Sequence, residues 1–365
     1  MKKIFKITSI VVIIIIGMND MIYSSNFIPA NNPNIQYFGR WDLSDSLHAK
    51  HSWPGVYICA EFTGTSISIR IIDKTNYYNV YIDGEFYKVF HGDKDGEADY
   101  TLAENLENTN HSFRLSKRNI VFGEIDVFSG FILDDEAELL PPPAEPKLKI
   151  EFAGDSFTAA ESNETTEQQL EWTERYPVTN IDKGFAPLIA KHYNAQYHTT
   201  CRSGIGMVCD WQGNFDVSLP KFFDRTLMEA EQPKWDFKKW IPDLVVVCLG
   251  LNDMSGLKDS TGNIPEENSL IYRSTYHEFI SSLRKVYPGV KILAVAAFPD
   301  WIRNNVKRVV DEEQQNGHKD IYYAAFDYFE SGYVGNGHPT VETHKKMADQ
   351  IIAEIDSLNI LQMNK

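Results

Sequence analysis

The chain has 365 residues, of which 43% are hydrophobic and 24% charged, and its formal net charge is −16. This length exceeds what one ordinary hydrophobic core fills, so we expect about two domains. The acidity argues against a nucleic-acid partner, because phosphate would be repelled. Four cysteines in no zinc-binding spacing, and no phosphate loop or dinucleotide motif, argue against a metal or nucleotide cofactor.

Residues 1–25 have the features of a secretory signal peptide. The chain begins Met-Lys-Lys-Ile-Phe-Lys, continues with a short apolar run over 10–17, and carries small residues at 24–25. The apolar run is well short of the roughly 20 residues that cross a membrane. No cysteine precedes Cys59, which excludes a lipid-modified N-terminus. We therefore expect export to the periplasm or the medium without a stable membrane anchor, and a monomeric protein.

Residues 27–140 form a series of short alternating runs, separated by turn signals such as Asp83-Gly84. Many short strands at this spacing predict an all-β sandwich or jelly roll. The expected strands are 55–62, 66–72, 77–82, 85–90, 111–115 and 120–127.

Residues 141–147 contain four prolines and predict a stiff linker, after which strands and helices alternate over 148–365. This alternation predicts an α/β domain with a doubly wound parallel sheet. The expected strands are 147–153, 195–201, 243–249, 290–297 and 321–326, and the expected helices are 183–193, 268–286, 303–316 and 340–357.

Four candidate site residues follow these strands or precede the last helix, so all should meet at one rim of the sheet. Ser156, in Gly-Asp-Ser, can supply a nucleophilic hydroxyl, and His338 can accept its proton. The main-chain amides of Ser156 and Gly204 and the side-chain amide of Asn252 can form an oxyanion hole. Gly206 is a rival donor to Gly204. The set predicts acyl transfer from an ester.

Read in order, Gly154-Asp155-Ser156, Gly204, Gly250-Leu251-Asn252-Asp253 and His338-Pro339 resemble the four blocks of the SGNH (GDSL-type) hydrolases over about 147–358. The resemblance implies a flavodoxin-like fold for this domain. A β-domain placed in front, with its opening segments 37–41 and 53–58, resembles carbohydrate esterase family 2. That resemblance implies an exported O-acetyl esterase for plant-type polysaccharides or oligosaccharides, with the hexose 6-hydroxyl as a candidate position.

One departure from the family pattern concerns the third member of the triad. SGNH hydrolases usually have Asp three residues before the histidine, but here that position is Gly335. We therefore predict a Ser156–His338 dyad whose imidazole is oriented by Asn336 or by a main-chain oxygen. His344 should lie on the surface of the last helix. Asp155 and Asp253 should brace the loops.

Three aromatic residues near the strand ends, Trp211, Trp301 and Tyr333, are candidate sugar contacts, although packing is the alternative for each. Two other functions stay open: an SGNH lipase or thioesterase acting on acyl chains, and a catalytically silent glycan-binding protein. The sequence also leaves open whether Cys201 and Cys209 pair.

Overall fold

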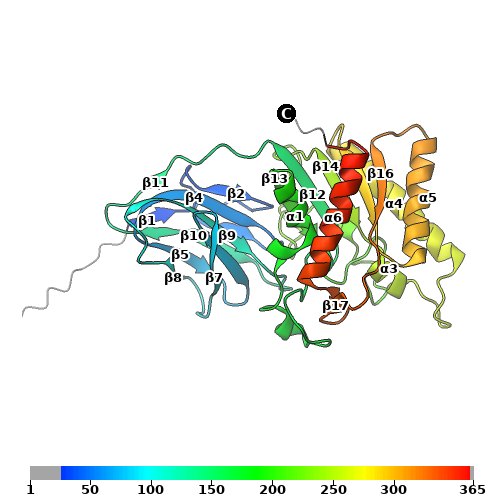
Figure 1. The fold of residues 1–365 in the computed structure, drawn as a ribbon, viewed down its shortest axis with the longest axis horizontal. Coiled ribbons are helices and arrows are strands. Elements are labelled where there is room, and N and C mark those ends of the chain that lie inside the picture. Colours follow the sequence, from blue (N-terminus) through cyan, green and yellow to red (C-terminus); the bar gives the residue numbers. More distant parts are fainter. Residues whose placement is uncertain (1–25, 362–365) are drawn as a thin grey trace, which may run out of the picture.

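The computed structural model describes residues 26–361, so the predicted signal peptide lies outside the described residues. Figure 1 shows a β-domain and an α/β domain side by side along the long axis of the molecule. Between residues 26 and 361 no helix has the length and apolarity needed to cross a membrane.

The β-domain is a sandwich of two antiparallel sheets, as predicted. One sheet contains β1 (Asn26–Pro29), β3 (Ala49–His51), β5 (Ile67–Ile72), β8 (Ala98–Ala103) and β10 (Asp126–Leu133). The other contains β2 (Gln36–Phe38), β4 (Tyr57–Gly64), β6 (Tyr77–Ile82), β7 (Glu85–His91), β9 (Thr109–Lys117) and β11 (Leu139–Leu140). Alternate residues of these strands point into a shared apolar core.

The predicted strand 120–127 is wrong for most of its length. Residues 118–125 form a loop, and β10 begins at Asp126 and continues to Leu133. The apolar side chains of this loop are used elsewhere: Ile120 is buried beside Ser203 of the α/β domain, and Phe122 stacks on Trp172 with ring centroids 4.9 Å apart. The loop is apolar because it packs against the second domain.

The α/β domain contains a five-stranded parallel sheet of β12 (Leu148–Gly154), β13 (Ala195–Cys201), β14 (Leu244–Cys248), β15 (Lys291–Ala296) and β16 (Ile321–Ala325). The strand order is β13-β12-β14-β15-β16, which confirms the predicted flavodoxin-like sheet. In this order the chain reverses direction across the sheet at β12, between β13 and β14. Ligands bind at such a point, outside the carboxyl ends of the strands.

Helices cover both faces of this sheet. Helices α1 (Phe185–His192) and α6 (Val341–Ser357) pack together over one face, while α4 (Glu266–Val286) and α5 (Asp300–Gln315) pack over the other. Alternate residues of β14 enter the two cores, Val246 on the α1 side and Val245 on the α4 side. The short elements are η1 (Trp172–Arg175), η2 (Ile181–Lys183), α2 (Leu219–Phe222), α3 (Leu251–Gly256), β17 (Tyr333–Val334) and β18 (His338–Pro339).

The two domains share a buried polar interface. Arg40 of the β-domain is 1% exposed and donates to Glu151 on β12 at 2.8 Å and to the Arg225 carbonyl at 2.9 Å. The Thr199 hydroxyl donates to the Pro54 carbonyl at 2.5 Å. Such buried contacts hold the domains in one arrangement, so the β-domain can contribute to the site.

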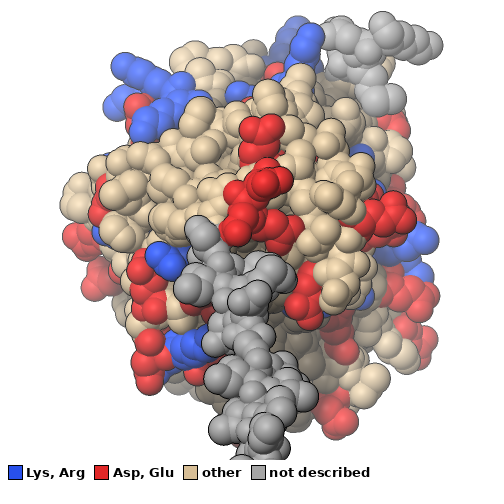
Figure 2. All heavy atoms as spheres, turned by 90° about the vertical axis from the view of Figure 1, so that its left-hand side faces the viewer, with Lys and Arg blue, Asp and Glu red and all other residues tan. Residues whose placement is uncertain are grey.

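All four cysteines are free thiols, and Cys201 and Cys209 do not pair. Figure 2 looks onto the β-domain end of the molecule, where acidic side chains are spread over the surface with fewer basic ones among them. This face agrees with the acidic composition of the chain.

Candidate active site

Ser156 lies two residues beyond the carboxyl end of β12, the strand between β13 and β14. It is 8% exposed and begins a segment of consecutive turns, 156–164, that is buried as far as Asn163. Gly154 leaves no room for a side chain, because a Cβ there would lie 1.9 Å from the Thr158 hydroxyl. The Asp155 carboxylate accepts from the Phe157 amide at 3.0 Å and so fixes the turn that carries Ser156.

The segments that carry the three predicted oxyanion donors are linked by Asn252. Asn252, in the first turn of α3, donates from Nδ2 to the Ile205 carbonyl at 2.8 Å, and the same nitrogen lies 3.4 Å from Asp155 Oδ2. Asn252 therefore contacts both the residue after Gly204 and the residue before Ser156. Within 26–361 no protein group accepts a hydrogen bond from the amide of Ser156 or of Gly204. Both amides remain available to a developing oxyanion.

Asp253 braces the loop that carries Gly204, as predicted. Its buried carboxylate accepts from the amides of Met207 at 2.7 Å and Val208 at 2.6 Å. Gly206 packs directly on this carboxylate, since a Cβ there would lie 2.5 Å from Asp253 Oδ2. Gly204, two residues before Gly206, has a left-handed backbone with φ of +77°, and a Cβ there would lie 2.9 Å from Trp211 Cδ1.

His338 is positioned by the β17–β18 hairpin, whose turn is Gly335-Asn336-Gly337. Its Nδ1 lies 2.6 Å from the Gly335 carbonyl oxygen, so Nε2 is the ring nitrogen that stays free of this bond. Asn336 points elsewhere, with its side chain bonded to the Leu170 amide at 2.9 Å and to Gln169 at 2.8 Å. Of the two predicted orienters, the structure places the main-chain oxygen, and not Asn336, at the imidazole.

Gly335, where the family pattern has Asp, cannot carry a side chain here. Its φ is +45°, and a Cβ would lie 2.4 Å from the Ser162 Cβ and 3.2 Å from Thr165 Cγ2. The space that a side chain at position 335 would need is occupied by Ser162 and Thr165, which follow Ser156 in the chain.

A carboxylate approaches His338 on the Nε2 side of the ring, opposite the Gly335 carbonyl. Glu161 Oε1 lies 3.9 Å from His338 Nε2, beyond hydrogen-bond distance, and accepts from Arg175 Nη1 at 2.7 Å. The side chain of Glu161 is 7% exposed. Sequence reasoning missed this residue because no motif marks a glutamate five residues after the serine.

The expectation that His344 lies on the surface is wrong. His344 is fully buried, and its Nδ1 accepts from the Phe185 amide at 3.4 Å, because α6 packs this face on α1. Burial, and next the nearby His338, lower the pKa of His344 to about 3. Its burial and its low basicity make it no rival to His338 as a base.

The three candidate sugar contacts differ in their surroundings. Trp211 is 57% exposed, and its side chain lies against Gly204. The main-chain amide of Trp211 donates to the Gly204 carbonyl at 3.0 Å. Tyr333 stacks on Phe157 and on the exposed Tyr328, which sequence reasoning missed. Trp301 packs on Tyr272 and donates its indole N–H to Ser269 at 2.9 Å, so the structure shows it in a packing arrangement.

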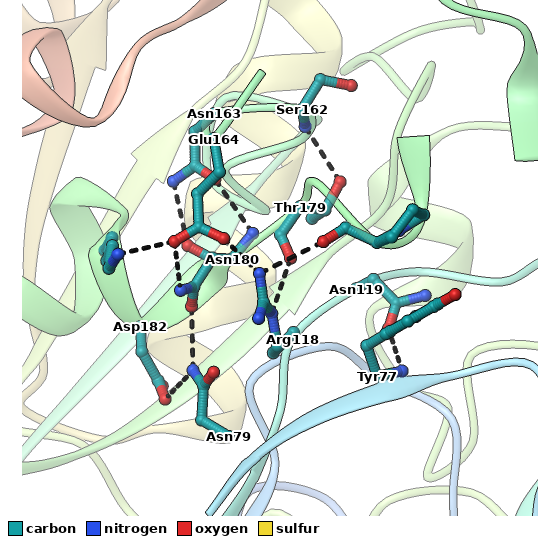
Figure 3. Close-up of polar contacts among 12 residues, drawn as sticks. Tyr77, Asn79, Arg118, Asn119, Ser162, Asn163, Glu164, Thr179, Asn180 and Asp182 are labelled. Carbon is teal, nitrogen blue, oxygen red and sulfur yellow. Dashed lines mark hydrogen bonds and ion pairs between the residues drawn. The ribbon is translucent and has the colours of Figure 1, made fainter. Parts of the chain in front are cut away.

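The β-domain reaches this site through Arg118, in the loop after β9. Arg118 donates to the Thr179 carbonyl at 3.1 Å and pairs with Glu164, while the Ile181 amide donates to the Arg118 carbonyl at 3.1 Å. Figure 3 shows Arg118 between Glu164 and Thr179, with Asn180 bridging Glu164 to Asn79 of the β-domain. The segments 161–164 and 175–183 are thereby tied to the β-domain.

Asp155 is expected to make the stability of the fold depend on pH. Burial, together with the neighbouring Asp253, raises the pKa of Asp155 to about 7, against the lowering effect of the Phe157 amide. The folded state then binds more protons than the unfolded state between pH about 4 and about 7, so this group makes stability fall as pH rises through that window. We expect Asp155→Asn to flatten the decline in the free energy of unfolding between pH 5 and pH 8, measured by denaturant titration. Equal slopes in both proteins would contradict this.

Comparison with known proteins agrees with this arrangement. The family model described as carbohydrate esterase 2 N-terminal matches residues 37–143, and the GDSL-like lipase/acylhydrolase model matches 150–351. The chain is 29% identical over 337 residues to the cellulase/esterase CelE of Acetivibrio thermocellus, covering 89% of this chain and 39% of that protein. It is 31% identical over 236 residues to an acetylxylan esterase/glucomannan deacetylase of Cellvibrio japonicus, covering 64% of each. The chain thus spans less than two thirds of the length of either relative.

Among solved structures, a family two carbohydrate esterase from Clostridium thermocellum, in complex with cellohexaose, superposes with a TM-score of 0.79. The two are 28% identical, and the match covers 90% of this chain and all of the other. Both domains therefore have counterparts in one known architecture, and the predicted resemblance is confirmed. The chain belongs to the GDSL-like lipases and acylhydrolases, and its two-domain architecture resembles that of carbohydrate esterase family 2.

Proposed function

We propose that this protein is a carbohydrate O-acetyl esterase that works through an acyl-enzyme on Ser156. The observation that carries the proposal is the hydrogen bond between His338 Nδ1 and the Gly335 carbonyl, which fixes the tautomer and leaves Nε2 free to act as a base. In the proposed reaction Ser156 Oγ attacks the acetyl carbonyl and its proton passes to His338 Nε2. The oxyanion is held by the main-chain amides of Ser156 and Gly204 and by one N–H of Asn252, which gives up its long 3.4 Å contact with Asp155 Oδ2. The ester C–O bond then breaks as Nε2 returns the proton to the sugar oxygen.

The second half of the reaction uses the same groups. A water molecule gives a proton to His338 Nε2 and its oxygen bonds to the acetyl carbon. The bond to Ser156 Oγ then breaks, acetate leaves, and the serine regains its proton. Such a Ser–His pair needs no carboxylate behind the imidazole, provided that a fixed acceptor holds Nδ1.

A carbohydrate substrate is supported by the domain pair and by what the relatives are named for, acetylxylan, glucomannan and a cellulase/esterase. The exposed rings of Trp211 and Tyr328 near the site suit stacking on sugars. The small cavity beside Glu161, lined also by Ile120 and Trp172, has a volume of about 10 Å³, which is room for about one water. Ser156 and His338 do not line it, so its size does not decide between an acetyl group and a longer acyl chain. The hexose 6-hydroxyl, export and the monomeric state stay predictions.

The test compares acetate release from acetylated xylan, glucomannan and mannan, with a long-chain acyl ester as the lipase arm. We expect acetate from at least one polysaccharide and little turnover of the long-chain ester. The Ser156→Ala variant serves as control. Faster cleavage of the long-chain ester would favour the lipase. Binding of the de-esterified glycan without any acetate release would favour a silent glycan-binding protein.

A further inference from the structure

Because position 335 has no aspartate, no carboxylate lies at Nδ1 to stabilise a positively charged His338. When the imidazole takes the serine proton it becomes a cation, and the neutral Gly335 carbonyl stabilises that cation less than a carboxylate would. The β17–β18 hairpin that carries His338 has no charged residue over 333–339. A charge that stabilises the imidazolium must therefore come from another segment.

The segment after Ser156 supplies one. We propose that Glu161 is a positioning residue for His338, providing from the Nε2 side the negative charge that is missing at position 335; this inference rests on the proposed Ser156–His338 reaction. At 3.9 Å from Nε2, Glu161 Oε1 is close enough to stabilise a positive ring. It is too far to take the Nε2 hydrogen bond that Ser156 needs.

The position of Glu161 is fixed at high conformational cost. The residues on either side, Ala160 and Ser162, have left-handed backbones with φ of +54° and +56°, and both are fully buried. Such non-glycine residues persist only where the surroundings determine them, and they cluster at functional sites. The Glu161 amide also donates to the Ser156 carbonyl at 3.0 Å, so the carboxylate and the nucleophile belong to one rigid turn.

The β-domain helps to fix this turn. The Ser162 amide donates to the Thr179 hydroxyl at 2.9 Å, the same hydroxyl donates to the Arg175 carbonyl at 2.7 Å, and Arg118 of the β-domain holds the Thr179 carbonyl (Figure 3). Arg175 in turn binds Glu161. Arg118 therefore holds, through Thr179, both the turn of Glu161 and the partner of its carboxylate.

The charged groups around His338 set the expected pH behaviour. Glu161 faces Nε2, Arg175 lies behind Glu161, and Asp155 lies beside Ser156 in the same turn. His344, from α6, is buried and neutral. A negative charge at Glu161 favours the protonated ring, so its removal moves the acid limb of the pH profile to lower pH. Removal of the Arg175 cation moves the same limb to higher pH.

The test measures kcat and KM against pH for wild type, Glu161→Gln and Arg175→Gln, with an acetyl aryl ester as substrate. We expect Glu161→Gln, which keeps the size and a hydrogen bond to Arg175, to lower kcat about tenfold with KM within about twofold. The acid limb should move to lower pH in Glu161→Gln and to higher pH in Arg175→Gln. As a control, Asp311→Asn breaks an exposed ion pair with Lys307 on α5 and should change neither kcat nor the position of the acid limb.

An acid limb that stays in place in Glu161→Gln would overturn the inference. Should that variant melt below the assay temperature, an unmoved limb in Arg175→Gln would overturn it equally. Arg118→Lys tests the contribution of the β-domain. A fall in kcat with KM unchanged would support the contacts from Arg118 through Thr179 to Glu161. A wild-type kcat would refute that contribution. If Ser156→Ala keeps wild-type activity, the proposed function itself fails, and that result is distinct from a failure at Glu161 alone.

Discussion

Replacing Ser156 by alanine is expected to lower kcat for acetyl ester hydrolysis by at least about a thousandfold, because no other hydroxyl takes its place at the oxyanion donors. Ser156 is 8% exposed, and alanine differs from it by one hydroxyl, so the fold should be retained. The melting temperature should change little, and binding of de-esterified oligosaccharide should persist.

A matched control for this variant is Ser203→Ala. Ser203 lies next to Gly204, its buried hydroxyl has no hydrogen-bond partner between residues 26 and 361, and it lines the small cavity beside Glu161. Its loss should leave kcat within a few-fold of wild type. Equal activity of Ser156→Ala and wild type would show that Ser156 is not the nucleophile.

Restoring the family aspartate by Gly335→Asp is expected to damage the enzyme instead of completing a triad. The new Cβ would meet the Ser162 Cβ at 2.4 Å, and a left-handed backbone costs an aspartate about 1 kcal/mol. We expect a loss of about 2–4 kcal/mol in the free energy of unfolding, from strain and overpacking together. The Gly335 carbonyl would shift from His338 Nδ1, and a misplacement of about 1 Å costs about a hundredfold in rate.

Two further variants separate the causes of that damage. Gly317 is also left-handed, with φ of +93°, but no atom lies within 4 Å of a Cβ there. Gly317→Asp should therefore show the backbone strain alone, about 1 kcal/mol. Adding Ser162→Gly to Gly335→Asp should recover part of the stability, since it removes the clashing Cβ. Higher activity in Gly335→Asp than in wild type would contradict this account of the hairpin.

Much of the α/β domain was predictable because its strands and helices have strong local signals. Apolar runs such as 244–249 mark strands buried on both faces, and Thr340 caps α6 by accepting from the Thr343 amide, as a residue of this type does at a helix start. The four candidate site residues could be assigned to one rim because each follows a strand or precedes a helix in a parallel sheet.

Other parts were not predictable because they depend on contacts between distant segments. The loop 118–125 has the alternation of a strand, yet Phe122 packs on Trp172 of the other domain. His344 has the polarity of a surface residue, yet its side chain is buried where α6 packs on α1. Glu161 and Arg118 have no local motif, and only the folded chain shows them linked to His338 and to the turn that carries Ser156.

The central claim, an acetyl-enzyme on Ser156, is tested most directly by mass spectrometry of the protein quenched with acid during turnover of an acetylated polysaccharide. We predict that the peptide containing Ser156 gains the mass of one acetyl group in wild type, and that this adduct is absent from Ser156→Ala. Acetate released at the wild-type rate by Ser156→Ala, with no acetylated peptide in either protein, would contradict the claim.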